Sequence, residues 1–118
     1  MNRSNQLSAL VSKRAAKHLS QFRRDVERSF QHRVREVVLF GSRARGDSTR
    51  TSDYDVAVVL EEDGFNRREI THTLSDLAYP HVIAGVHIRP VYVGDSALQS
   101  AKARSTVFDI ERDGVSIP

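Results

Sequence analysis

Apolar residues recur every three or four positions through the first quarter of the chain, with lysine and arginine between them. This period is that of an amphipathic helix, so the spacing predicts one helix over residues 5–31. We expect its apolar face to pack either on its own sheet or on a second chain. The apolar stripe consists of Leu7, Val11, Ala15, Leu19, Phe22, Val26 and Phe30.

Three shorter stretches have the pattern of strands. Residues 34–40 are rich in valine and stop at Gly41, and residues 53–60 alternate between two faces. Residues 82–93 predict a third strand, in which Pro90 favours a sheet edge or a bend because proline cannot donate to a ladder.

Capping signals predict two further helices. Asn66 opens a helix over 66–78 and Ser96 opens one through about residue 104, since each is followed three residues later by Glu or Gln. The last twelve residues predict one more helical turn, stopped by Gly114, and a short extended end. The order of elements predicts an α/β (α+β) fold, a small mixed sheet with helices packed on it.

Composition narrows the class of protein. At 118 residues with neither repeats nor linkers, the chain is expected to form a single domain over 1–118. It has no cysteine, so disulfides and thiolate metal sites are excluded. No apolar run approaches the ~18 residues of a membrane span, and the polar start lacks the apolar core of a secretory signal. We therefore expect a cytoplasmic protein with no membrane partner.

The charge is divided unevenly along the chain. Residues 1–50 hold 12 Lys and Arg against 4 Asp and Glu, whereas residues 51–118 hold 6 against 11. A basic half suits an anionic partner such as nucleic acid or nucleotide phosphates, but for the charges before residue 34 we favour a solvated helix face. Interleaved aromatics and nucleic-acid fold signatures are lacking, so nucleic acid is not expected as the primary partner.

The turn after the first strand carries candidate chemistry for phosphate. Gly41 permits a sharp bend and a close approach of the backbone to a ligand. Ser42 stands where a short helix through Ala44 could begin, and the N–H groups and hydroxyl at such a start favour phosphate. Arg43 and Arg45 add fixed positive charge that suits phosphate oxygens. A Gly-Ser pair after a strand is common in loops, so this turn alone is weak evidence.

Two acids follow one residue apart at the start of the second strand. On an extended strand Asp53 and Asp55 project to the same side, roughly 7 Å apart at their Cα atoms. Their carboxylates can converge on one or two hard cations such as Mg²⁺. Both could instead face water, with Ser52 only capping a turn, but like charges on one strand face repel and a cation would relieve the repulsion. Together the turn and the acids predict a nucleotide–metal pocket.

The combined motif, G-S-R-A-R-G-D followed by S-D-Y-D-V-A-V, resembles the nucleotidyltransferase superfamily that includes DNA polymerase β and kanamycin nucleotidyltransferase. The length resembles that of its smallest branch, the minimal nucleotidyltransferases (MNT). The resemblance is dense over residues 37–60 and architectural beyond them. It implies a polymerase β-like fold with an N-terminal helix.

The resemblance also implies roles for individual residues. In that family the Gly-Ser turn holds the nucleotide's phosphates and the D-x-D pair holds Mg²⁺. The candidate nucleotide-binding residues are Gly41, Ser42, Arg43, Arg45 and Ser52. The candidate catalytic and metal-binding residues are Asp53 and Asp55.

Active members of the family usually carry a third acid on a later strand, and this sequence departs from that pattern. The corresponding strand offers His87 and Arg89 on its polar face. His87 could serve as a base near neutral pH, although we favour a surface histidine beside a surface arginine. The nearest acid, Asp95, has the position of loop or helix-cap material.

The resemblance implies an enzyme that uses Mg²⁺ to move a nucleoside monophosphate, AMP being expected, from an NTP such as ATP to a hydroxyl. Minimal members are often antitoxins that silence a helical HEPN-domain RNase toxin by modifying one of its tyrosines. We therefore expect a protein partner, a HEPN-domain toxin. The alternative is a weak or inactive member of the fold that silences its partner by binding alone. The missing third acid favours the alternative, and the retained motif favours the enzyme.

Overall fold

The computed structural model describes residues 4–62, 66–96 and 104–118. A four-stranded mixed sheet in the order β3-β2-β1-β4 lies at its centre. Strand β2 runs antiparallel to β1 and parallel to β3, and β4 is antiparallel to β1. The strands are β1 (Val34–Phe40), β2 (Tyr54–Leu60), β3 (Ile88–Gly94) and β4 (Val115–Ser116). The predicted mixed sheet with packed helices is confirmed.

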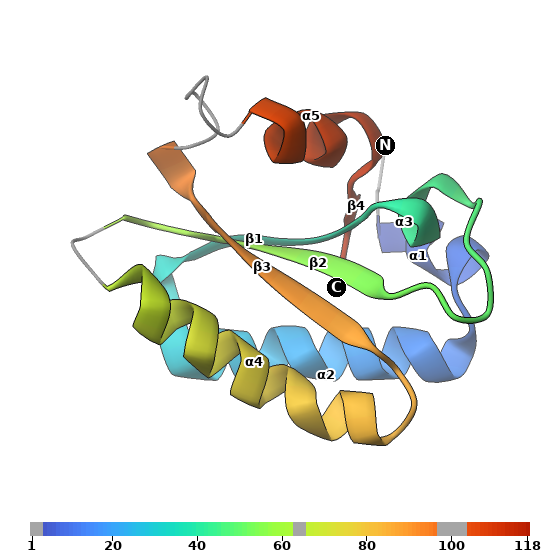
Figure 1. Ribbon diagram of the computed structural model, residues 1–118, viewed down its shortest axis with the longest axis horizontal. Coiled ribbons are helices and arrows are strands. Elements are labelled where there is room, and N and C mark those ends of the chain that lie inside the picture. Colours follow the sequence, from blue (N-terminus) through green and yellow to red (C-terminus); the bar gives the residue numbers. More distant parts are fainter. Residues whose placement is uncertain (1–3, 63–65, 97–103) are drawn as a thin grey trace.

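The helices cover both faces of this sheet. Helices α2 and α4 lie on one face and α5 lies on the other, while α1 and the short α3 stand at one end (Figure 1). A single 3₁₀ turn, Gln31–Arg33, joins α2 to β1. The helices are α1 (Ser4–Leu10), α2 (Lys13–Phe30), α3 (Ser42–Arg45), α4 (Arg67–Ile83) and α5 (Arg104–Asp113).

The alternation predicted for the second strand divides the core into two clusters. Val56, Val58 and Leu60 of β2 pack with α2 and α4 in the larger cluster. Ala57 and Val59 face the other way and pack with Ile110 of α5 in a smaller one. Because successive side chains alternate, Asp55 shares the face of Ala57, but it lies at the start of the strand, where the side chain keeps 17% of its surface exposed.

The prediction of a single helix over residues 5–31 is wrong, because two helices, α1 and α2, cover this part of the chain. Helix α1 ends at Leu10, and Ser12 caps α2 by accepting a hydrogen bond from the Ala15 backbone N–H at 3.1 Å. Leu7 and Ala15 are both buried in the larger cluster. Both helices bury their apolar residues in the same cluster, so the hydrophobic period continues across the break between them. The period therefore does not show where α1 ends.

The helix predicted over 66–78 begins as expected, with Asn66 capping the Arg68 backbone N–H at 2.8 Å. It continues through Pro80 to Ile83, so the prediction that a strand begins at residue 82 is wrong. Proline has no N–H to donate, but its carbonyl accepts from the Ala84 N–H at 3.2 Å and closes the last turn. Strand β3 lies at the sheet edge, as Pro90 predicts.

At the C-terminus, the helix predicted from residue 96 through about 104 lies mostly outside the described residues. The single helical turn predicted in the tail is too short, because α5 continues to Asp113 and the extended end forms β4 beside β1. Gly114 stands between them, where a Cβ would overlap the Ile110 carbonyl and the Val38 side chain. This close packing accounts for the predicted stop.

A polar contact joins α2 to α4 inside the helical layer. His18 Nδ1 lies 2.8 Å from Nδ1 of the buried His81, and Asp25 Oδ2 lies 3.8 Å from Nε2 of His81. Burial lowers the pKa of His81, His18 lowers it further, and Asp25 raises it in part. Burial therefore favours the neutral form of His81 in the folded protein.

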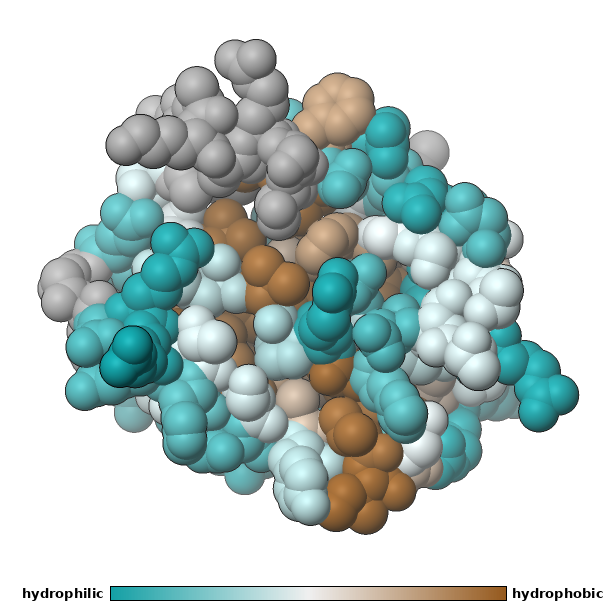
Figure 2. Space-filling model, in the orientation of Figure 1, coloured by the Kyte–Doolittle hydropathy of each residue, from teal (hydrophilic) through white to brown (hydrophobic). Residues whose placement is uncertain are grey.

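The molecular surface is mostly polar in the orientation of Figure 1. Figure 2 shows a hydrophobic patch over the C-terminal end of α4, and Ile83, the last residue of that helix, is exposed. Among the helices in the described ranges, none combines the length and hydropathy that a membrane crossing requires.

Candidate nucleotide and metal site

The candidate phosphate turn follows β1 directly. Gly41 has φ 76° and ψ −157°, a conformation almost restricted to glycine. Its carbonyl accepts hydrogen bonds from the backbone N–H groups of Ala44 at 3.1 Å and Arg45 at 3.0 Å. The turn thus becomes the single-turn helix α3, which begins at Ser42 as the sequence predicts.

The two halves of the motif meet at Gly41 and Asp55. Asp55 stands opposite Phe40 in the antiparallel ladder, so its carboxylate lies beside the residue that follows Phe40. A Cβ at position 41 would stand only 2.5 Å from Asp55 Oδ2. Gly41 is therefore required twice, once for its backbone conformation and once for the close approach of a carboxylate.

Asp53 and Asp55 stand at the open start of β2. Asp53 is exposed, and Asp55 is the first acid within the strand. Between them, the backbone N–H of Tyr54 donates to the His87 carbonyl at 2.9 Å, which fixes the start of β2 beside the segment that leads into β3. The His87 side chain is exposed at this same end of the sheet.

An arginine occupies the place next to Asp55 where the family pattern leads one to expect an acid. The parallel register pairs Asp55 with Arg89, and Arg89 Nε donates to Asp55 Oδ1 at 2.8 Å. Asp95 follows the far end of β3, where it accepts from the Glu62 N–H and pairs with Arg35. Within the described part of the chain, no group of three His, Asp or Glu is arranged to hold a metal ion.

Arg43 connects the phosphate turn to the acids. Its Nη2 and Nε donate to the Ser52 carbonyl at 2.9 and 3.2 Å, and its guanidinium lies 4.3 Å from the centre of the Tyr54 ring. The Ser52 hydroxyl accepts from the Thr49 backbone N–H at 2.9 Å. Both predicted nucleotide ligands thus also hold the loop between α3 and β2, and their contact with nucleotide stays a prediction.

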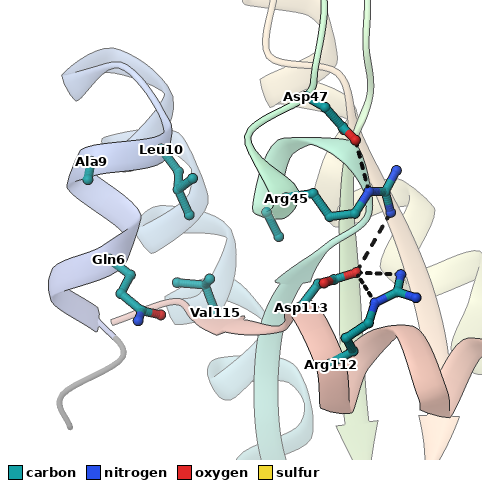
Figure 3. Close-up of a pocket in the computed structure, with 9 residues that line it drawn as sticks. Gln6, Ala9, Leu10, Arg45, Asp47, Arg112, Asp113 and Val115 are labelled. Carbon is teal, nitrogen blue, oxygen red and sulfur yellow. Dashed lines mark hydrogen bonds and ion pairs between the residues drawn. The ribbon is translucent and has the colours of Figure 1, made fainter.

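Arg45 lines a cavity between α1, α3 and the end of α5. Its guanidinium pairs with Asp47 at 3.2 Å and with Asp113 at 3.8 Å (Figure 3). Arg112 donates to Asp113 at 2.7 Å, and this hydrogen bond lowers the pKa of the Asp113 carboxyl. The cavity, about 680 Å³, is lined by Gln6, Ala9, Leu10, Ala44, Arg45, Asp47, Arg112, Asp113 and Val115.

The family assignment follows from a comparison with known domains. Residues 19–101, which include the turn, the acids and β3, match the model of the nucleotidyltransferase domain. The chain belongs to the nucleotidyltransferase domain family. The resemblance carried by the motif is thereby confirmed, and the Gly41–Asp55 contact is the place where this member joins the two halves of that motif.

Individual relatives agree with this family. A curated protein of Methanocaldococcus jannaschii, provisionally named a protein adenylyltransferase, is 36% identical over 47 residues, which are 40% of this chain and 47% of that protein. The chain thus spans about half the length of this curated relative.

Two solved structures are similar. A nucleotidyltransferase from Sulfolobus solfataricus, also provisionally named, matches with a TM-score of 0.63 and 25% identity over 87% of this chain and 78% of that chain. A toxin–antitoxin structure with AMP-PNP matches with a TM-score of 0.48 and 23% identity over 84% and 72%, a likeness too distant to carry an argument.

The chemistry of the donors fits one hard divalent cation. Asp53 and Asp55 provide carboxylate oxygens, which Mg²⁺ prefers, and a nucleotide's phosphates and water can complete an octahedron. Asp55 Oδ2 lies against the phosphate turn, whereas Oδ1 is engaged by Arg89.

Sequence reasoning found the turn and the acids but missed three partnerships. The Arg89–Asp55 pair depends on the parallel register of β2 and β3. The sequence predicts the third strand from residue 82, and that start does not determine which residue stands beside Asp55. The contacts of Arg43 with the Ser52 carbonyl, and of Arg45 with Asp113, join residues with no local spacing signal.

Proposed function

We propose that this nucleotidyltransferase-family protein is a Mg²⁺-dependent enzyme that moves a nucleoside monophosphate from an NTP to a hydroxyl of a partner protein. The observation that carries the proposal is the contact of Asp55 with Gly41, which brings one carboxylate of the predicted pair against the phosphate turn. The name of the M. jannaschii relative supports AMP, hence ATP, and a protein acceptor. The motif resemblance supports an antitoxin role towards a HEPN-domain toxin.

Each residue of the turn and the pair has a defined task in this proposal. Gly41 and Ser42 receive the phosphates, with Arg43, Arg45 and Ser52 as further candidates for contact. Asp53 and Asp55 hold the cation, which when bound neutralises phosphate charge and polarises the reacting phosphoryl group. Arg43 also keeps the acids in register with the turn through the Ser52 carbonyl.

The transfer is a substitution at the α-phosphorus of the NTP. A bond forms between the acceptor hydroxyl oxygen and the α-phosphorus, and the bond from that phosphorus to the bridging oxygen of the β-phosphate breaks. Pyrophosphate leaves with the electron pair, and the hydroxyl proton passes to solvent. The exposed imidazole of His87 is the candidate side chain for taking that proton instead.

A second function has one observation in its favour. Arg89 stands where a third carboxylate would complete a site for two cations, and this supports a protein that silences its partner by binding with little or no transfer. The fold and pocket would be the same, so only a measurement of transfer separates the two functions.

Intact mass of the partner tests the proposal. The protein is incubated with MgCl₂, each NTP in turn and its co-expressed partner. We expect the partner to gain the mass of one or more nucleoside monophosphates, and Asp53→Asn and Asp55→Asn to abolish the gain. Asp76→Asn, which changes an exposed carboxylate on α4, is the matched control and should leave the gain unchanged. A partner that is inhibited while its mass stays unchanged would refute transfer and support binding.

A further inference from the structure

The register of the sheet fixes the position of Arg89 next to Asp55. The parallel ladder places it directly beside Asp55, and β3 carries no acid at this end. Its guanidinium is permanently charged, so it cannot become a metal ligand by losing a proton. Whatever binds at Asp55 must therefore coexist with this charge or displace it.

The two oxygens of Asp55 have different surroundings. Oδ1 accepts from Arg89 Nε at 2.8 Å, on the side of β3. Oδ2 lies towards Gly41, on the side of the phosphate turn. A cation can therefore share Oδ2 with the turn while Arg89 keeps Oδ1, whereas a cation that requires Oδ1 must break the ion pair.

The charges of the site also favour a single cation. Asp53 and Asp55 contribute two negative charges and Arg89 returns one positive charge. Within the described residues, no other carboxylate or imidazole joins the pair in a metal-binding group. The three side chains together carry a net charge of −1, which suits one divalent cation that arrives with the phosphates. A second cation bound to Asp55 would be repelled by the Arg89 guanidinium, which is hydrogen-bonded to that carboxylate.

We propose that Arg89 limits the Asp53–Asp55 pair to one divalent cation and supplies the positive charge that a second cation would bring. The proposal rests on the proposed function, because it presumes that the pair binds a cation together with an NTP. Arg89 is in this view a positioning residue, which holds Asp55 by one oxygen and leaves the other for the cation.

The test counts bound Mn²⁺, a paramagnetic substitute for Mg²⁺, by electron paramagnetic resonance. MnCl₂ is titrated into the full chain alone and into the chain with one equivalent of a non-hydrolysable ATP analogue. We expect the unaltered chain with the analogue to bind one Mn²⁺. Arg89→Asp, which places an acid beside Asp55, should raise the number to two. Arg89→Gln should keep the number at one and tighten Mn²⁺ binding by the chain alone about tenfold, because it removes a like charge near a divalent ion.

Arg28→Gln is the matched control. Arg28 is exposed to 74%, against 63% for Arg89, and likewise pairs with an aspartate, Asp25, but on α2. It should change neither the number of Mn²⁺ ions nor their affinity. If Arg89→Asp fails to fold by circular dichroism, the Arg89→Gln affinity decides the outcome.

The outcomes separate the two proposals. Two Mn²⁺ ions on the unaltered chain would overturn the role of Arg89 and leave the proposed function standing. So would Arg89 variants that bind the same number of Mn²⁺ ions with the same affinity as the unaltered chain. An unaltered chain that binds neither Mn²⁺ nor the analogue would overturn the proposed function, and the role of Arg89 with it.

Discussion

Replacing Gly41 by alanine tests whether the turn and the acid pair form one site. At φ 76° and ψ −157° an alanine is strained by about 1–3 kcal/mol. The added Cβ would also stand 2.5 Å from Asp55 Oδ2, so the carboxylate must move. Loss of its ion pair with Arg89 adds up to about 1 kcal/mol, since the Arg89 side chain is largely exposed to water. We expect Gly41→Ala to lower the free energy of unfolding by about 1–4 kcal/mol.

The same substitution should remove ligand binding, which a purely structural glycine would not do. Gly85→Ala is the matched control, because Gly85 also has a positive φ, 96°, but a Cβ there would come no closer than 3.8 Å to another residue, Arg14. We expect this control to lose about 1–2 kcal/mol of stability through its backbone alone.

Urea unfolding gives the stability of both variants, and the shift of melting temperature with MgCl₂ and ATP gives ligand binding. Only Gly41→Ala should lose the ligand-induced shift. A Gly41→Ala protein as stable as the Gly85→Ala protein and with an unchanged shift would refute the close approach of Asp55 to the turn.

Two further substitutions test other contacts. Arg43→Ala should lower the free energy of unfolding by about 1–2 kcal/mol, because it removes hydrogen bonds to the Ser52 carbonyl and stacking on Tyr54, and Arg43→Lys should recover less than half. Urea unfolding measures both, and full recovery by lysine would show that charge alone matters. Because burial lowers the pKa of His81 below 6.5, its contribution to stability is complete above that pH and is lost as pH falls towards the folded-state pKa. The free energy of unfolding should therefore fall as the pH is lowered through 6.5, and His81→Gln should flatten that slope. An unchanged slope would contradict the neutral His81–His18 contact.

Local signals in the sequence predicted the parts of the fold that local interactions determine. The bounds of β1 and the single turn of α3 follow from a valine run, a glycine and a serine within twelve residues. The cap at Asn66 likewise depends on neighbours two and three positions away.

The errors lie where distant contacts decide the structure. The break at Ser12 is invisible to periodicity, because α1 and α2 bury their apolar residues in one core. Helix α4 continues past the predicted end at residue 78 to Ile83, and the buried His81 of this extension contacts His18 of α2, 63 residues earlier in the chain.

In the candidate site, too, local spacing could be predicted and distant contacts could not. Gly41, Ser42, Asp53 and Asp55 could be named from the motif, since their spacing is local. The pairing of Asp55 with Arg89 depends on the register of two strands separated by a helix, and no spacing along the chain encodes it.

Transfer of label from ATP to the co-expressed partner tests the central claim most directly. Two reactions with MgCl₂ run in parallel, one with radiolabel in the α-phosphate of ATP and one with radiolabel in the γ-phosphate. Nucleotidyl transfer predicts that the partner retains the α label but not the γ label, and that Asp55→Asn abolishes the retention while Asp76→Asn does not. Retention of the γ label, or of neither label by a partner that is nevertheless inhibited, would contradict the account.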